Sequence, residues 1–254
     1  MTSTMIALIS LACIFSGTLL GLTLSRILPK HHLSDDSKDA VKIGAGMISM
    51  MAALVLGLLV SSAKSNFDST NTAITQAGAK VILLDRDLAS FGPESREVRV
   101  GLRQAVATML AALWPEEKGP TDSAMNALEH ATTLEQLLDR IRALRPQSDA
   151  QRAVQTHALQ LGNDLLLIRW LQIEQAQVGL PIAFLIVVLF WLTMLYTSFG
   201  LLAPRNATVI SVMFIGALAL ATALFLIMEM NRPMAGTIKI SSGPMRKALE
   251  HLGR

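Results

Sequence analysis

Charged residues are scarce in this sequence. Asp, Glu, Lys and Arg make up 16% of its 254 residues, whereas about a quarter is usual in a soluble domain. Cysteine occurs once, at Cys13, so neither an intrachain disulfide nor a zinc site built on several cysteines can form. The net charge of +3 is too small to indicate nucleic acid as a partner, and no basic run is interleaved with aromatic residues.

The signatures of common enzymes are missing as well. The sequence has no H-E-x-x-H motif, no P-loop, no G-x-G-x-x-G after a strand and no G-x-S-x-G. We therefore predict that the protein is not an enzyme and that it uses no cofactor.

One cluster contains the residue types of a metal site. His31 and His32 precede the carboxylates of Asp35, Asp36 and Asp39, and together they offer ligands for a cation. The same carboxylates stand where a helix is expected to begin, and acidic side chains stabilise helix N-termini without any ligand. We favour the capping role and predict no metal site.

What the sequence does contain is a set of long apolar runs. A bilayer is crossed by about 20 residues of helix, and each run reaches that length. The first run competes with a signal peptide, which needs a basic start and an apolar core of about 7–15 residues. No Lys or Arg precedes Met5, and the core is too long, so we interpret it as a retained helix. The expected spans cover about 5–28, 43–63, 178–202 and 207–230.

These spans divide the chain into four parts. No sustained alternation with a period of two residues occurs, so no sheet is expected. We predict an all-α membrane protein with four transmembrane helices in two pairs, whose long helices extend into a helical extramembrane domain. The parts are a first transmembrane hairpin (1–63), the helical domain (64–176), a second transmembrane hairpin (177–230) and a basic C-terminal tail (231–254).

The second span continues into the inserted domain as a heptad pattern. No proline interrupts the stretch before Gly92-Pro93, which is a helix stop. We predict one helix over 43–91, roughly 70 Å long at 1.5 Å per residue. The residues of the heptad seam are Phe67, Thr70, Ile74, Ala77, Val81, Leu84, Leu88 and Phe91.

Three further amphipathic helices are expected in the insert, near 98–112, 125–144 and 154–168. The segment 245–252 has an apolar stripe that suits the membrane surface. Asp85-Arg86-Asp87 is interpreted as an exposed ion pair on the long helix, and His157 as an isolated side chain.

The second span holds two rows of residues that bear on its function. The first row consists of small residues at every fourth position, which lets helix backbones approach closely; the second, about 130° around the helix, is bulkier. The small residues pack against neighbours in the bundle in one interpretation. In the other, copies of this helix surround an axis, and the bulky row forms a hydrophobic constriction that gates by dewetting. The small row is Ala45, Ser49, Ala53 and Gly57, and the candidate pore-lining residues are Met47, Met51, Leu54, Leu58, Ser61, Ser62 and Ser65.

The distribution of Lys and Arg predicts the orientation in the membrane. Four spans place both termini and the inserted domain on one side. The tail carries five basic residues, whereas the turn between the last two spans carries only Arg205, and basic residues favour the cytoplasmic side. We expect the termini and the helical domain to be cytoplasmic, although the basic flank after the first span favours the opposite orientation.

Several short motifs resemble the bacterial bestrophin-like membrane family, a domain of unknown function. They lie in six places along nearly the whole chain: residues 33–39, 41–47, 84–86, 91–94, Trp114-Pro115 and 231–233. The resemblance implies a protein of the bacterial inner membrane. Bestrophins are pentameric anion channels whose second transmembrane helix lines the pore neck. The second span here lacks their aromatic neck residues, and no calcium site can be transferred.

Two functions follow as hypotheses. The first is a homo-oligomeric ion channel, an anion channel and a pentamer by resemblance, with membrane lipid and small inorganic ions as its partners. The alternative is a membrane-anchored scaffold or sensor that conducts nothing and uses its helical domain to bind a partner.

Overall fold

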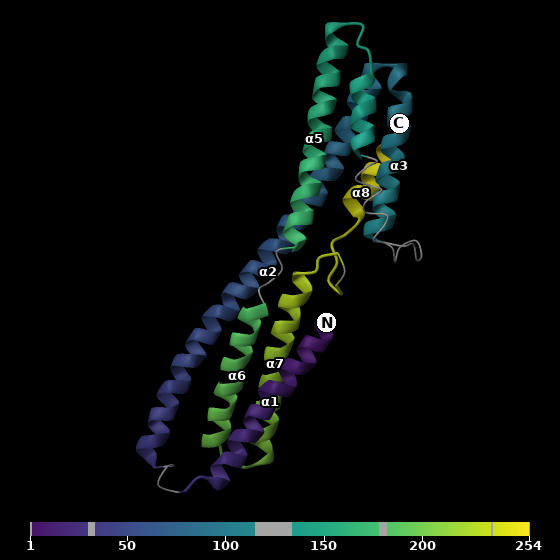
Figure 1. Cartoon of the computed structure of the whole chain (residues 1–254). Helices are drawn as coiled ribbons and strands as arrows, with labels where there is room; N and C mark the ends of the chain where they lie inside the picture. The colour runs from purple at the N-terminus through teal and green to yellow at the C-terminus, as the bar shows by residue number, and fades with distance from the viewer. Residues whose placement is uncertain (1, 30–33, 115–133, 178–181, 235, 254) are drawn as a thin grey trace. The chain divides into compact units, whose positions relative to one another are not determined.

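The computed structural model describes residues 2–29, 34–114, 134–177, 182–234 and 236–253, and the regular structure in these ranges is helical throughout. This confirms the all-α prediction. Residues 134–143 are helical, whereas His31, His32 and the expected helix start near 125 lie outside the described residues. The elements in Figure 1 are α1 (Ser3–Ile27), α2 (Asp35–Phe91), the 3₁₀ turn η2 (Pro93–Ser95), α3 (Arg96–Leu113), α5 (Asp149–Gln177), α6 (Ile182–Leu202), α7 (Ala207–Met230) and α8 (Gly243–His251).

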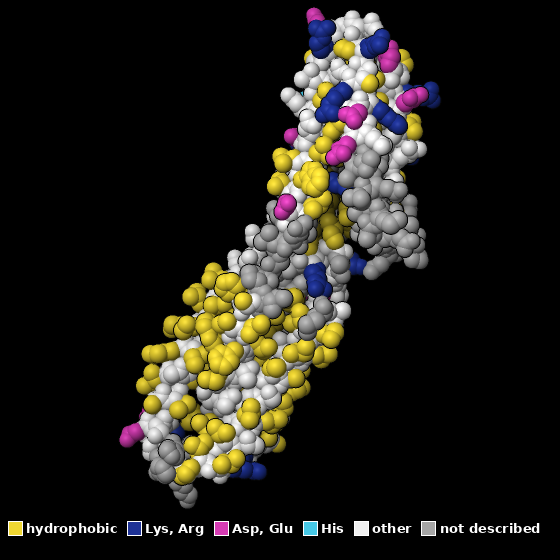
Figure 2. All heavy atoms as spheres, viewed as in Figure 1, with side chains coloured by type: hydrophobic (Ala, Val, Ile, Leu, Met, Phe, Trp, Pro, Cys, Tyr) yellow, Lys and Arg dark blue, Asp and Glu magenta, His cyan; other side chains and the backbone are white. Residues whose placement is uncertain are grey.

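Four of the described helices are long and apolar enough to cross a membrane. They are α1, α2, α6 and α7, which confirms the four predicted spans. The chain divides into two compact units, residues 1–67 with 179–238 and residues 68–178 with 239–254. In Figure 2, hydrophobic side chains are spread over the visible face of the first unit, and most of the visible charged side chains lie on the second.

The prediction of one unbroken helix over 43–91 is confirmed, because α2 runs without interruption through both units. Its last turn is capped by side chains. The Ser95 hydroxyl donates to the carbonyl oxygens of Leu88 and Gly92, the latter at 2.8 Å. Gln151 donates from Nε2 to the carbonyl oxygen of Phe91 at 2.7 Å. Gly92, with φ of 124°, takes a backbone conformation that other residues rarely adopt, and the helix ends there.

Helices α1 and α6 of the first unit are in very close contact. A Cβ atom at Gly17 would lie 2.6 Å from the carbonyl oxygen of Thr193, and one at Gly21 would lie still closer to that of Thr197. Gly200 faces the backbone of α1 in the same way. Glycines at i and i+4 allow this approach in a membrane helix.

The core of the first unit contains residues from all four spans. Helix α2 contributes Ala52, Leu59 and Ala63, at intervals of seven and four residues that keep them on one face of the helix. The other buried members are Ile14 of α1, Val188, Leu192 and Tyr196 of α6, and Ala217, Leu224 and Ile227 of α7.

The heptad seam of α2 forms the core of the second unit. Its residues from Thr70 to Phe91 are buried, with Leu84 and Leu88 fully enclosed. Helix α8 also belongs to this unit. Its apolar residues Met245 and Ala248 are buried against protein, so the expectation that this segment lies on the membrane surface is wrong. The amphipathic pattern fits either surface, and only the fold selects between them.

Candidate functional site

The bulky row of α2 is exposed along its length. Met47 and Leu54 are each 66% exposed, Leu58 is 62% exposed and Met51 is 52% exposed. Met50, which the sequence analysis did not single out, is 77% exposed and lies between them in sequence. These five side chains point away from the core residues of the same helix, because their positions fall on the opposite side at 100° per residue. We call these five residues the α2 outer face.

The small residues of α2 do not form one packing surface. Ala45 is buried and Ser49 is half-buried, whereas Ala53 and Gly57 are exposed. Each four-residue step advances about 40° around an α-helix, so the row rotates from the core side towards the α2 outer face. Its first half packs inside the unit and its second half faces outward.

The outward glycines leave room beside the helix. A Cβ atom added at Gly44, Gly46 or Gly57 would meet no atom within 4 Å. These glycines therefore serve no close contact between the described residues, in contrast to those of α1. Glycine in the interior of a helix costs about 0.5–1 kcal/mol relative to alanine, which leaves their presence here unexplained by packing within one chain.

Serines follow the apolar stretch towards the second unit. Ser61, Ser62 and Ser65 are all exposed, on the part of α2 where the first unit ends. Lys64 is exposed among them, with Nζ 6.0 Å from the centre of the Phe67 ring. The predicted pore-lining set thus combines an exposed apolar stretch with an exposed hydroxyl-rich stretch on one continuous helix.

Helix α2 is also the least enclosed of the four spans. In the most apolar 18-residue stretch of α2, 17% of the residues are buried, whereas 33% are buried in the corresponding stretch of α1. Its apolar side chains need lipid or a protein surface outside the protomer to cover them.

A buried ion pair in the second unit contradicts the interpretation of residues 85–87. Asp85 is buried rather than exposed, and the Arg99 guanidinium donates to both of its oxygens at 2.8 and 2.9 Å. The backbone N–H of Gly253 also donates to Asp85, at 3.2 Å. Hydrogen bonding to Asp85 raises the pKa of Arg99, although burial opposes the shift. Its neighbour Asp87 contacts Nδ1 of His157 at 2.6 Å, so this histidine is not isolated either.

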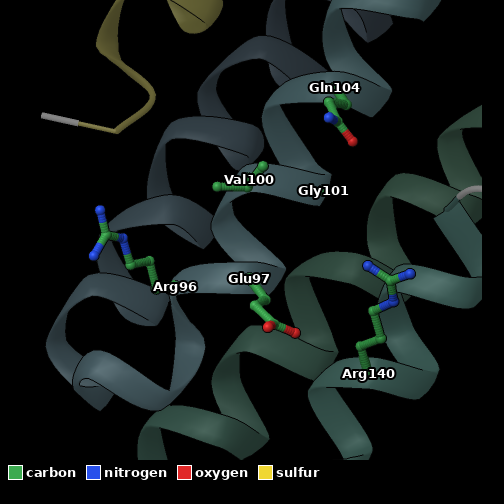
Figure 3. Close-up of a pocket in the computed structure, with 6 residues that line it drawn as sticks. All are labelled: Arg96, Glu97, Val100, Gly101, Gln104 and Arg140. Atoms are coloured by element: carbon green, nitrogen blue, oxygen red, sulfur yellow. The ribbon is translucent and has the colours of Figure 1, made fainter.

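An open groove of about 340 Å³ lies on the second unit. Figure 3 shows Glu97 of α3 and Arg140 of the 134–143 helix extending towards the same space, while Arg96 points away. Opposite charges face the groove, and all of these side chains are exposed. The groove therefore offers no enclosed environment for catalysis.

The sequence did not indicate a structural role for one acidic residue. Glu229, near the end of α7, is buried and accepts hydrogen bonds from Thr237 and from the side chain of Ser3. It connects the start of α1 with the segment that follows α7. A lone carboxylate at the end of an apolar run was the available signal.

Within the described ranges, no group of three or more His, Cys, Asp and Glu residues is arranged to hold a metal ion.

Known proteins resemble this chain over most of its length. A family model described as the bestrophin-like domain matches residues 12–245. A mutant of a bacterial bestrophin homologue from Klebsiella pneumoniae is similar in structure, with a TM-score of 0.66, 14% identity, and coverage of 96% of this chain and 97% of that chain. Another structure of a bacterial bestrophin homologue from the same organism gives a TM-score of 0.63 at 15% identity, covering 94% and 97%. No curated protein sequence matches the chain.

Proposed function

Because the chain belongs to the bestrophin-like family, we propose that it is a homo-oligomeric ion channel of the bacterial inner membrane. By family resemblance the ion is an anion and the oligomer a pentamer. The observation that carries the proposal is the α2 outer face. It is apolar, it is unpartnered within the protomer, and outward glycines accompany it.

The pore is lined by one α2 helix from each subunit. The outward small residues Gly46, Ala53 and Gly57 let neighbouring helices approach closely at the axis. Met47, Met51, Leu54 and Leu58 then narrow the path and exclude water, so that it conducts only when wetted. Ser61, Ser62 and Ser65 supply hydroxyl groups at the mouth, where an ion exchanges part of its hydration shell.

A flux assay in liposomes tests this arrangement. Leu54→Ser places a hydroxyl in the constriction, lowers the cost of wetting it and is expected to raise anion flux by about tenfold. Leu218→Ser is the matched control, because Leu218 lies midway along α7 and is 45% exposed; flux through this variant should equal that of the unchanged protein. Both variants should elute from a sizing column in detergent as the same oligomer of 27.4 kDa subunits.

Two outcomes contradict the proposal. One is a correctly folded protein that conducts nothing, either unchanged or with Leu54→Ser. The other is a two-fold dimer or a monomer in detergent, because neither encloses an axis with several α2 helices.

The scaffold function remains the second candidate, since α5 exposes apolar residues in the second unit. Leu167 is 59% exposed and Trp170 is 51% exposed, and these positions, three residues apart, share a helix face. A scaffold requires this face to bind a partner protein, and in that case Leu167→Ser abolishes partner binding while liposomes show no flux.

A further inference from the structure

The α2 outer face contains a methionine cluster with no counterpart on the other spans. Met47, Met50 and Met51 occupy positions i, i+3 and i+4, which are neighbours on a helix surface. All three are more than half exposed. From this placement we infer that the cluster is an oxidation site at which peroxides switch the channel towards its conducting state. The inference rests on the proposed function.

Access to the three thioethers is open. Gly44 and Gly46 stand within three residues of Met47, and a Cβ atom added at either would meet nothing within 4 Å, so no other helix lies against α2 at these two glycines. Met245, by contrast, is 1% exposed. The cluster lies at the end of the constriction nearest the start of α2, so an oxidant that enters from that side reaches it without crossing the rest of the dewetted path, whereas the buried Met245 stays out of reach.

The chemistry is a single oxygen transfer. The O–O bond of the peroxide breaks, an S–O bond forms, the thioether sulfur loses two electrons and the peroxide gains them. With peroxymonosulfate as the oxidant, hydrogensulfate leaves. The product, methionine sulfoxide, is polar where the thioether was apolar.

Oxidation changes the conductance because the α2 outer face forms the proposed constriction. An apolar constriction blocks ions because water leaves it, and a sulfoxide oxygen accepts hydrogen bonds from water. One oxygen atom per methionine, repeated in each subunit, replaces an apolar ring with a polar one. Oxidation of the cluster therefore acts in the same direction as Leu54→Ser, and we expect flux to rise by about tenfold.

The test uses the full-length protein in liposomes and peroxymonosulfate, an anion that enters lipid poorly. Peptide mass spectrometry follows sulfoxide formation while anion flux is recorded. The matched controls are Met5 of α1 and Met194 of α6, which are 50% and 46% exposed but lie on other spans. We expect the α2 cluster to be oxidised first, and flux to rise with it.

A second protein carries Met47→Leu, Met50→Leu and Met51→Leu, which conserve volume and remove the oxidisable sulfur. Its flux should not respond to the oxidant but should still rise with Leu54→Ser. A variant with Met5→Leu and Met194→Leu should respond like the unchanged protein.

The outcomes separate the two proposals. Equal oxidation of Met194 and the cluster, an unchanged flux after oxidation of the cluster, or a response that survives in the triple leucine variant would each overturn the inference alone, provided that Leu54→Ser raises flux. If Leu54→Ser is also silent, the proposed function fails and the oxidation switch fails with it.

Discussion

Asp85 shows how much a single residue of the second unit connects. Its two oxygens receive the Arg99 guanidinium, and one of them also receives the backbone N–H of Gly253. The carboxylate therefore joins α2, α3 and the end of the chain. Its side chain is 5% exposed and that of Arg99 is 22% exposed, so water screens this pair less than the surface pairs of the same unit.

Removing the carboxylate charge should destabilise the second unit. Asp85→Asn leaves Arg99 half-buried without its counter-ion, and we expect a loss of about 1.5–3 kcal/mol, measured as a lower Tm in detergent. Asp139→Asn is the control: Asp139 pairs with Arg142 at the surface, with its side chain 72% exposed, and its loss should cost less than about 1 kcal/mol. Equal Tm values for the two variants would contradict the structural role given to Asp85.

At the scale of elements, glycine has opposite roles in α1 and α2. Gly17 and Gly21 are covered by the backbone of α6, whereas Gly46 and Gly57 have empty space beside them. Both helices carry small residues at intervals of four, so the pattern alone does not tell which row packs inside the protomer. In α1 the contact is intramolecular. In α2 the outward residues of the small row, Ala53 and Gly57, are exposed on the protomer, so any partner for them lies outside it.

A matched pair of substitutions distinguishes the two roles. Gly21→Ala forces a methyl group into the backbone of α6 and should lower the Tm in detergent by an amount that corresponds to about 1–3 kcal/mol. Gly57→Ala meets nothing within the protomer and, as a helix-favouring change, should leave the stability of the protomer unchanged or raise it by up to about 1 kcal/mol. Because Gly57 lies where neighbouring α2 helices approach in the proposed channel, the same variant should weaken the oligomer and elute later from a sizing column. A larger loss from Gly57→Ala than from Gly21→Ala would reverse the assignment.

At the scale of the whole molecule, the two units differ in what their surfaces require. The first exposes apolar side chains on every span and needs lipid or other subunits to cover them. The second carries most of the visible charge (Figure 2) and suits water. With four spans and the termini on the side of the inserted domain, we propose that the termini and the second unit are cytoplasmic.

Cysteine labelling in intact cells tests this orientation. In a Cys13→Ser background, a single cysteine at Ser34, between α1 and α2, should react with a membrane-impermeant maleimide added outside. One at Ser90, exposed on α2 in the second unit, should react only after the cells are broken. The reverse pattern would place the second unit outside the cytoplasm, as the basic flank of the first span suggests.

The sequence alone was sufficient for the features that depend on local composition and period. The length of the apolar runs predicted four spans, and the heptad seam with its stop at Gly92-Pro93 predicted one helix through Phe91, because helical period and membrane thickness are properties of short stretches of chain. The pore-lining set of α2 stays a prediction: the structure places its residues on the exposed face of one protomer.

The tertiary structure determined what each apolar or charged helix face packs against. Asp85 was predicted to be exposed because the sequence around it gives no sign of its partners. Arg99 and Gly253 contact it only after three separate segments have packed together. Helix α8 was predicted to lie on the membrane surface because an apolar stripe can pack against lipid or against protein. Burial and pairing arise between segments that are distant in sequence. A periodic pattern therefore predicts that a helix face will be covered, but only the fold determines whether lipid or another part of the protein covers it.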